Sequence, residues 1–161
     1  MEIGASQMKK TIEEIYKKHK WELEMFGSTP EHYDDNIRNH YIYAWYTKTE
    51  PKKYFYIGRG KGKRYNHILK DIEDLKKPRK EKGYHYKILQ ENLGIDYEFL
   101  YQNLTQKEAV ILEAYVMLEF LKKKEPLLNI ITPCLDEEEE LARRKIFKEK
   151  DIQKFLDFYR K

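Results

Sequence analysis

The chain has 161 residues, of which 40% are hydrophobic, 14% aromatic and 37% charged, and its mean hydropathy is −0.91. This composition predicts one compact domain with terminal extensions and excludes a chain that is disordered throughout. The sequence has no signal peptide and no run of about 18 apolar residues, so we expect a soluble, cytoplasmic protein that does not enter a membrane.

Charge is distributed unevenly along the chain. The formal net charge is only +4, but thirteen Lys and Arg residues face five Asp and Glu residues between Lys52 and Glu91. A basic surface of this kind favours a polyanionic partner such as DNA. A solvated, lysine-rich surface with no such partner accounts for the composition equally well.

The first half of the chain predicts a helix followed by a β-hairpin. Residues 8–25 carry apolar side chains at helical spacing, and Gly27 and Pro30 end that pattern. The aromatic runs at 41–47 and 54–58 predict two strands. Because the intervening KTEPKK contains a proline and makes a turn, we expect the two strands to pair.

The second half predicts helices around a third strand. After the hairpin, an apolar face predicts a helix, which Pro78 ends. The apolar face consists of Ile68, Ile72 and Leu75. A short helix at 86–92 then ends at Gly94, a favoured C-terminal cap, and 96–101 reads as a strand.

A capping box of the type T-x-x-E, formed by Thr105 and Glu108, begins the best-specified helix, which continues to about Lys123. The segment 136–161 predicts one amphipathic helix with an acidic start.

This order of elements predicts an α/β (α+β) fold with a small, mainly antiparallel three-stranded sheet flanked by helices. We expect an amino-terminal helical extension at 1–38, a central domain at 39–133 and a carboxy-terminal helix at 134–161. The single cysteine, Cys134, cannot form an internal disulfide, and we expect it to be structural.

The stretch GRGKGKR at 58–64 is a basic, glycine-rich loop directly after the second strand. It has neither the Walker A spacing nor the G-x-G-x-x-G spacing, so it gives weak support for nucleotide-cofactor binding. Its glycines would still let the backbone approach a phosphate beside several cations, namely Arg59, Lys61, Lys63 and Arg64. A flexible basic turn is the simpler interpretation of this stretch alone.

Glu113 lies within an apolar stripe of the helix that begins after Thr105. Its neighbours one turn away are all apolar, namely Ala109, Val110, Val116 and Met117. Burying an unpaired carboxylate is costly, so Glu113 needs a cation or several hydrogen-bond donors. Two interpretations stay open here, a buried structural ion pair and a metal ligand.

Taken in order, these features resemble the GIY-YIG nuclease superfamily. The matching positions are YIY at 41–43, YIG at 56–58, Arg64, His67, Glu113 and Asn129. FYIGRGKGKR looks most like the branch of LEM-domain ankyrin-repeat nucleases and their microbial relatives, and TQKEAVILEAYVMLE followed by LLN is similar to the family's ending. The resemblance covers about residues 40–131. The chain departs from the pattern in four places. Tyr41 replaces the first glycine, Arg59 replaces a common lysine, and His67 follows Arg64 by three residues where some members have a four-residue step. Tyr65 does not match the catalytic tyrosine that some members carry four residues after the arginine.

The resemblance implies a catalytic set and a cofactor. The set comprises Tyr43, Tyr56, Arg64, His67, Glu113 and Asn129. Glu113 would bind one Mg²⁺ or Mn²⁺ ion whose other coordination positions are filled by waters and phosphate. Arg64 and Arg59 can bind phosphate oxygens. Lys61 and Lys63 would join Arg59 in binding the nucleic acid.

One of the two tyrosines would activate water, which requires nearby positive charge to lower a phenol pKa of about 10. The resemblance leaves open whether Tyr43 or Tyr56 does so, and most of the 14 tyrosines in the chain are expected to be packing residues.

The sequence therefore predicts a metal-dependent endonuclease that hydrolyses DNA phosphodiester bonds through a single-metal site. The alternative is a catalytically inactive nucleic-acid-binding module that uses the basic region 52–91, and a third interpretation is a protein–protein adaptor built on the terminal helices. Because one metal cuts one strand at a time, a double-strand break would need a homodimer or two visits.

Overall fold

The computed structural model of the protein describes residues 5–21, 32–74, 80–129 and 137–160. Some sequence expectations fall outside these ranges, namely those for Gly27, Pro30, Leu75, Pro78 and Cys134. Within the described part of the chain, no helix has both the length and the apolar character needed to cross a bilayer.

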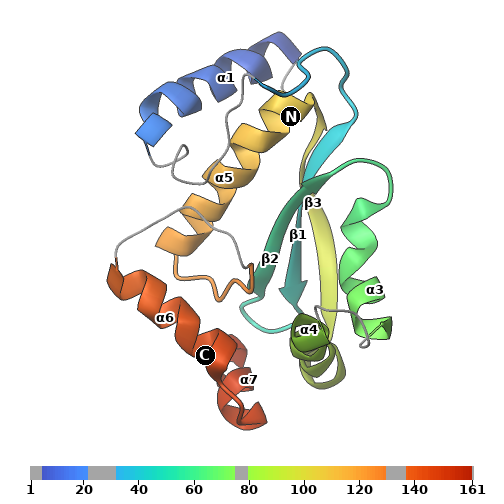
Figure 1. Ribbon diagram of the computed structural model, residues 1–161, viewed down its shortest axis with the longest axis vertical. Helices are drawn as coiled ribbons and strands as arrows, with labels where there is room; N and C mark the ends of the chain where they lie inside the picture. The colour runs from blue at the N-terminus through green and yellow to red at the C-terminus, as the bar shows by residue number, and fades with distance from the viewer. Residues whose placement is uncertain (1–4, 22–31, 75–79, 130–136, 161) are drawn as a thin grey trace.

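The described residues form a three-stranded sheet with helices on both sides, as Figure 1 shows. In chain order the elements are α1 (Ala5–Lys18), β1 (His40–Thr47), β2 (Lys53–Gly60), a 3₁₀ turn (Arg64–Asn66), α3 (His67–Glu73), α4 (Lys80–Leu93), β3 (Ile95–Leu104), α5 (Gln106–Lys122), α6 (Glu137–Lys148) and α7 (Ile152–Arg160). The predicted α+β class, with a small antiparallel sheet flanked by helices, is confirmed.

The sheet has the order β2-β1-β3, and both pairings are antiparallel. The predicted hairpin is therefore present, with Tyr43 opposite Gly58 and Trp45 opposite Tyr56. The central strand β1 is buried along almost its whole length, which explains its run of large apolar and aromatic residues. Consequently β2 lies at an edge of the sheet, and its outer side needs hydrogen-bond partners from elsewhere in the chain.

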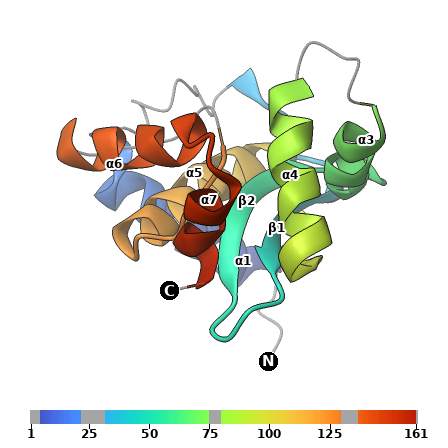
Figure 2. The ribbon, with the colours of Figure 1, turned by 90° about the horizontal axis from the view of Figure 1, so that it is seen from below.

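Alternation along the strands divides the core into two layers. Ile42 and Ala44 pack against α5, and α1 lies on the far side of α5 (Figure 1). Tyr41, Tyr43 and Trp45 point to the opposite face, where α3 and α4 lie (Figure 2). Successive side chains of a strand point to opposite faces, so β1 contributes to both layers.

Two helical segments differ from the sequence expectation. Helix α4 begins at Lys80 rather than near Tyr86 and runs through Gly83, whose burial indicates close packing at that point. The carboxy-terminal segment forms two helices rather than one. The second of them, α7, begins at Ile152. The Asp151 carboxylate just before it accepts a hydrogen bond from the Lys154 backbone N–H at 3.1 Å, as an N-terminal cap does.

Helix α7 belongs to the core. Phe155, Leu156 and Tyr159 are buried, and the Tyr159 hydroxyl donates a hydrogen bond to the Pro126 carbonyl at 2.7 Å. The helix therefore closes one end of the sheet beside β2 (Figure 2).

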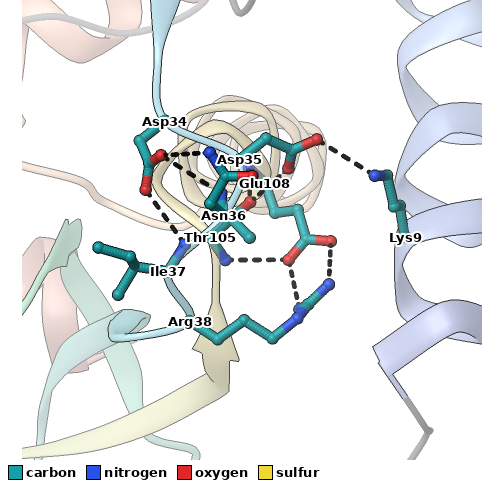
Figure 3. Close-up of polar contacts among 8 residues, drawn as sticks. All are labelled: Lys9, Asp34, Asp35, Asn36, Ile37, Arg38, Thr105 and Glu108. Carbon is teal, nitrogen blue, oxygen red and sulfur yellow. Dashed lines mark hydrogen bonds and ion pairs between the residues drawn. The ribbon is translucent and has the colours of Figure 1, made fainter.

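The capping box of α5 is present and is joined to the chain before β1 (Figure 3). The Thr105 backbone N–H donates to Glu108 at 3.0 Å, and the Thr105 side chain accepts from the Glu108 N–H. Arg38 forms a bidentate pair with the same carboxylate, at 2.7 and 3.1 Å. The Glu108 side chain is only 3% exposed, so this carboxylate depends on these donors.

Replacing Arg38 by alanine is expected to lower the free energy of unfolding by about 2–4 kcal/mol, because it leaves the buried Glu108 carboxylate without its cation. Urea denaturation measures the effect. The matched control is Lys9→Ala, which breaks the exposed Lys9–Asp35 pair of 3.3 Å and should cost less than about 1 kcal/mol. Equal effects of the two substitutions would contradict this account of the cap.

Candidate functional site

At Gly58 and Gly60, other side chains lie so close to the backbone that a residue larger than glycine does not fit. A Cβ at Gly58 would lie 2.6 Å from both the Cζ and the Oη of Tyr43, and a Cβ at Gly60 would lie 2.9 Å from the Cβ of Arg64. The Tyr43 phenol and the Arg64 stem therefore lie directly on the backbone of β2. Gly62 has a different role, since its φ of +60° favours glycine in the turn that follows.

We predict that Gly58→Ala destabilises the protein by about 1–3 kcal/mol, the usual cost of overpacking a filled core. The Tyr43 ring is 1% exposed and has little space to retreat. The free energy of unfolding in urea is the measurement. An unchanged value would mean that Tyr43 moves aside freely and that Gly58 does not fix its position.

Tyr43, Tyr56 and His67 form a compact group on the α3 side of the sheet, called here the tyrosine–histidine cluster. The Tyr43 and Tyr56 ring centroids are 6.1 Å apart, and the His67 ring lies 6.0 Å from Tyr43 and 4.7 Å from Tyr56. The two tyrosines occupy neighbouring cross-strand positions on one face, because Tyr43 faces Gly58 while Tyr56 faces Trp45. Three of the residues expected from the sequence are thus brought together.

The environment of this cluster acts on two pKa values. Burial, followed by the neighbouring Tyr56, raises the pKa of the Tyr43 phenol well above its usual range, and the charge of Arg64 only partly opposes this. Burial also lowers the pKa of His67, against the opposing effect of Asp71, whose carboxylate lies 3.6 Å from Nδ1. At neutral pH Tyr43 is therefore a protonated phenol and His67 a neutral imidazole.

Glu113 projects from α5 toward the outer edge of β2. Its carboxylate Oε1 lies 3.4 Å from the Arg59 Nε, and its side chain is 15% exposed. Burial raises the pKa of Glu113 to about 6, while the charges of Arg59 and Arg64 and hydrogen bonds from Arg59 act in the opposite direction. Arg59, expected from the sequence to bind nucleic acid, is therefore also the cation that the buried carboxylate requires.

This pKa predicts a pH-dependent stability in the absence of metal. Because the folded-state pKa of about 6 lies above the ordinary glutamate pKa of 4.5, folding favours the protonated form. The stability that Glu113 contributes is therefore fully present below pH 4.5 and is lost as pH rises through 6. The shift corresponds to roughly 2 kcal/mol. We expect the stability of Glu113→Gln relative to wild type to rise by about this amount between pH 4.5 and pH 8 in EDTA. A pH-independent difference would contradict the burial of this charge.

Asn129 supports the edge of β2 and is not part of the tyrosine–histidine cluster. Its side chain accepts a hydrogen bond from the Ile57 N–H at 3.1 Å and donates one to the Ile57 carbonyl at 2.8 Å. The adjacent Leu128 N–H donates to the Phe55 carbonyl at 2.7 Å, and Arg143 of α6 donates to the Asn129 carbonyl. Asn129 thus fixes the strand that carries Tyr56 and Arg59, which is a positioning role.

A depression of about 340 Å³ lies beside the cluster, lined by Lys63, Arg64, His67 and Lys70. Lys61 and Lys63 are exposed on the preceding loop. The lining carries three cationic side chains and one imidazole, a combination suited to an anion such as a phosphate group.

The donor set near Glu113 fits a magnesium ion only in a sparse form. Among the described residues, no group of three or more His, Cys, Asp and Glu side chains could hold a metal ion. Mg²⁺ is nevertheless commonly bound through one or two carboxylates together with waters and substrate phosphates. One partly accessible carboxylate that responds to the charge of Arg64, a residue lining the depression, is compatible with that mode, provided that a phosphate completes the site.

Sequence reasoning missed the structural roles of three residues that shape this region. Tyr41 donates a hydrogen bond from its hydroxyl to the Gly62 carbonyl at 2.8 Å, and its position on the same face as Tyr43 follows from strand alternation. Lys70 lines the depression from α3. Lys82 lies over the Tyr56 ring at 5.7 Å, and no local pattern in the sequence indicates that contact.

Comparison with protein-family models, with curated proteins and with solved structures found no match to this chain. The resemblance to GIY-YIG nucleases therefore rests on the motif positions in the sequence alone.

Proposed function

We propose that the protein is a metal-dependent endonuclease that hydrolyses DNA phosphodiester bonds at a GIY-YIG-type site, acting in the cytoplasm. The observation that carries the proposal is the convergence of separate sequence elements at β2. The strand hairpin supplies Tyr43 and Tyr56, the following turn and helix supply Arg64 and His67, and α5 supplies Glu113. The charges of Arg64 and Glu113 both act on the Tyr43 phenol, so these groups share one electrostatic environment.

In this proposal, Glu113 holds a Mg²⁺ or Mn²⁺ ion, which when bound neutralises phosphate charge and makes a coordinated water more acidic. Arg64 binds a non-bridging phosphate oxygen from the wall of the depression, where its stem is held against Gly60. Lys61, Lys63 and Arg59 contribute positive charge along the path of the DNA backbone. Asn129 keeps β2 in place.

The pKa of Tyr43 is raised and that of His67 is lowered, so the two residues have different roles in proton transfer. A Tyr43 phenol that stays protonated donates a hydrogen bond and is a poor base. His67 has a lowered pKa, Asp71 next to Nδ1, and a buried Nε2 with no hydrogen-bond partner among the described residues. A neutral imidazole with a free Nε2 can accept a proton. We therefore assign proton acceptance to His67 Nε2, with Tyr56 in ring contact beside it.

One observation favours a second function, a nucleic-acid-binding module without catalysis. The Arg59 guanidinium already neutralises Glu113, and a carboxylate engaged in this way is a weaker metal ligand. Under that function, DNA binding falls steeply with salt, and Glu113→Gln leaves binding unchanged.

The test is incubation of the purified chain with supercoiled plasmid and with branched oligonucleotide DNA, in Mg²⁺, in Mn²⁺ and in EDTA. We expect metal-dependent conversion of the plasmid to the open-circular form, and no conversion in EDTA. Retention of DNA with no cleavage in either metal would exclude the endonuclease and support the binding module.

A further inference from the structure

An aromatic cluster beside the candidate site presents one ring to solvent. It consists of Tyr41, Tyr65, Tyr97 and Phe99, on the α3 side of the sheet. The Phe99 ring contacts the other three at centroid distances of 4.9, 5.3 and 5.8 Å. Phe99 is 37% exposed, whereas Tyr41 at the base of the cluster is 9% exposed.

The aromatic cluster is held in place by the glycine loop. The Tyr41 hydroxyl donates to the Gly62 carbonyl at 2.8 Å and accepts a hydrogen bond from the Tyr65 N–H at 3.1 Å. The Tyr65 and Tyr97 rings lie 4.8 Å apart at an interplanar angle of 31°. The exposed Phe99 ring is therefore presented on a preformed support, so a ligand that stacks on it would not have to order it.

The position of Phe99 relates this surface to the proposed reaction. Phe99 contacts Tyr41, and Tyr41 lies 5.8 Å from Tyr43. Phe99 of β3 is also the direct cross-strand partner of Tyr43 of β1, so the aromatic cluster lies immediately next to the tyrosine–histidine cluster on the same face of the sheet. Lys61 and Lys63 are exposed on the loop that leads to Tyr65, so positive charge accompanies the apolar ring.

We propose that the aromatic cluster stacks an unpaired base of the strand that lies in the candidate site, so that the preferred substrate has single-stranded DNA next to its duplex. Aromatic rings bind unpaired bases of any sequence through their π-faces, and adjacent cations hold the backbone. A base inside a duplex already stacks on its neighbours and cannot occupy Phe99. This inference rests on the proposed function for the location of the strand.

The experiment measures binding, in EDTA, of fluorescently labelled duplex, flap and single-stranded thymidine oligonucleotides. Phe99→Leu keeps an apolar side chain on β3 but removes the π-face, and Phe99→Ala removes the whole ring. Tyr84→Ala, at a 50% exposed aromatic residue of α4, is the matched control. We expect both Phe99 variants to weaken flap and single-strand binding about fivefold to 100-fold and to leave duplex binding within about twofold.

A second readout reports stacking itself. The base analogue 2-aminopurine, placed at successive positions of the flap, should be quenched by the wild type at one position, and Phe99→Leu should remove that quenching. The inference would be overturned if Phe99→Leu bound flap DNA as tightly as wild type, or if it lost as much affinity for duplex DNA as for flap DNA. A changed oligomeric state with unchanged DNA binding would overturn it as well. Plasmid nicking by the wild type is scored separately. If the wild type nicks DNA but the Phe99 variants bind flap DNA normally, only the stacking surface is refuted. If the wild type does not nick DNA but flap binding depends on Phe99, only the nuclease is refuted.

Discussion

Replacing Glu113 by glutamine is expected to reduce metal-dependent plasmid nicking by about 10³-fold or more. Glutamine keeps the shape and one oxygen of the side chain but removes the negative charge that would hold the divalent ion. Nicking rates under enzyme excess, measured on agarose gels, report the effect. DNA affinity in EDTA should stay within about threefold of wild type, because the phosphate contacts come from Arg64 and the lysines.

The Glu113→Gln variant should still fold, since the substitution has two opposing effects on the free energy of unfolding. It removes a buried charge whose pKa is raised to about 6, and it also removes the ion pair with Arg59. We expect the free energy of unfolding at pH 8 to stay within about 1–2 kcal/mol of wild type. Undiminished nicking by a folded variant would show that Glu113 is a structural ion-pair residue.

Replacing Arg64 by alanine is expected to lower the nicking rate by about 10²–10³-fold, the usual loss when one charged donor to a reacting oxygen is removed. Arg64→Lys should recover part of the loss, because it keeps the stem that lies on Gly60 and one positive charge but not the bidentate fork. Single-turnover rates at saturating DNA separate this effect from weaker binding.

The control for Arg64 is Arg144→Ala on α6, a 61% exposed side chain that forms an ion pair with Glu140 at 3.9 Å. It removes the same charge far from the depression and should change nicking less than about threefold. If both variants lost activity equally, the effect of Arg64 would be one of net charge and not of the site.

Local chemistry made much of the fold predictable. The aromatic runs on either side of a proline turn specify the hairpin, and the Thr105–Glu108 box specifies where α5 begins. Gly94 has the φ of +76° that its predicted capping role requires. Each of these features depends on residues close together in the sequence, so no tertiary information was needed.

The site was less predictable because its contacts are long-range. The apolar stripe correctly indicated that Glu113 needs a partner, but the identity of Arg59 depends on how α5 packs on β2. The resemblance placed Asn129 in the catalytic set, but its hydrogen bonds to Ile57 depend on the path of the chain after α5. The segment 136–161 forms two helices because Asp151 caps the second one. The sequence pattern of 136–161 fits a single amphipathic helix and does not indicate this break.

The most direct test of one shared reacting centre is a double-variant cycle on plasmid nicking in Mg²⁺, using wild type, Glu113→Gln, Arg64→Lys and the combination. Residues that act as a unit on one phosphate lose activity together, so the combined variant should nick as slowly as Glu113→Gln alone and no slower. A combined loss equal to the product of the two single losses, or a wild type that never cuts DNA when the metal is supplied, would contradict the account.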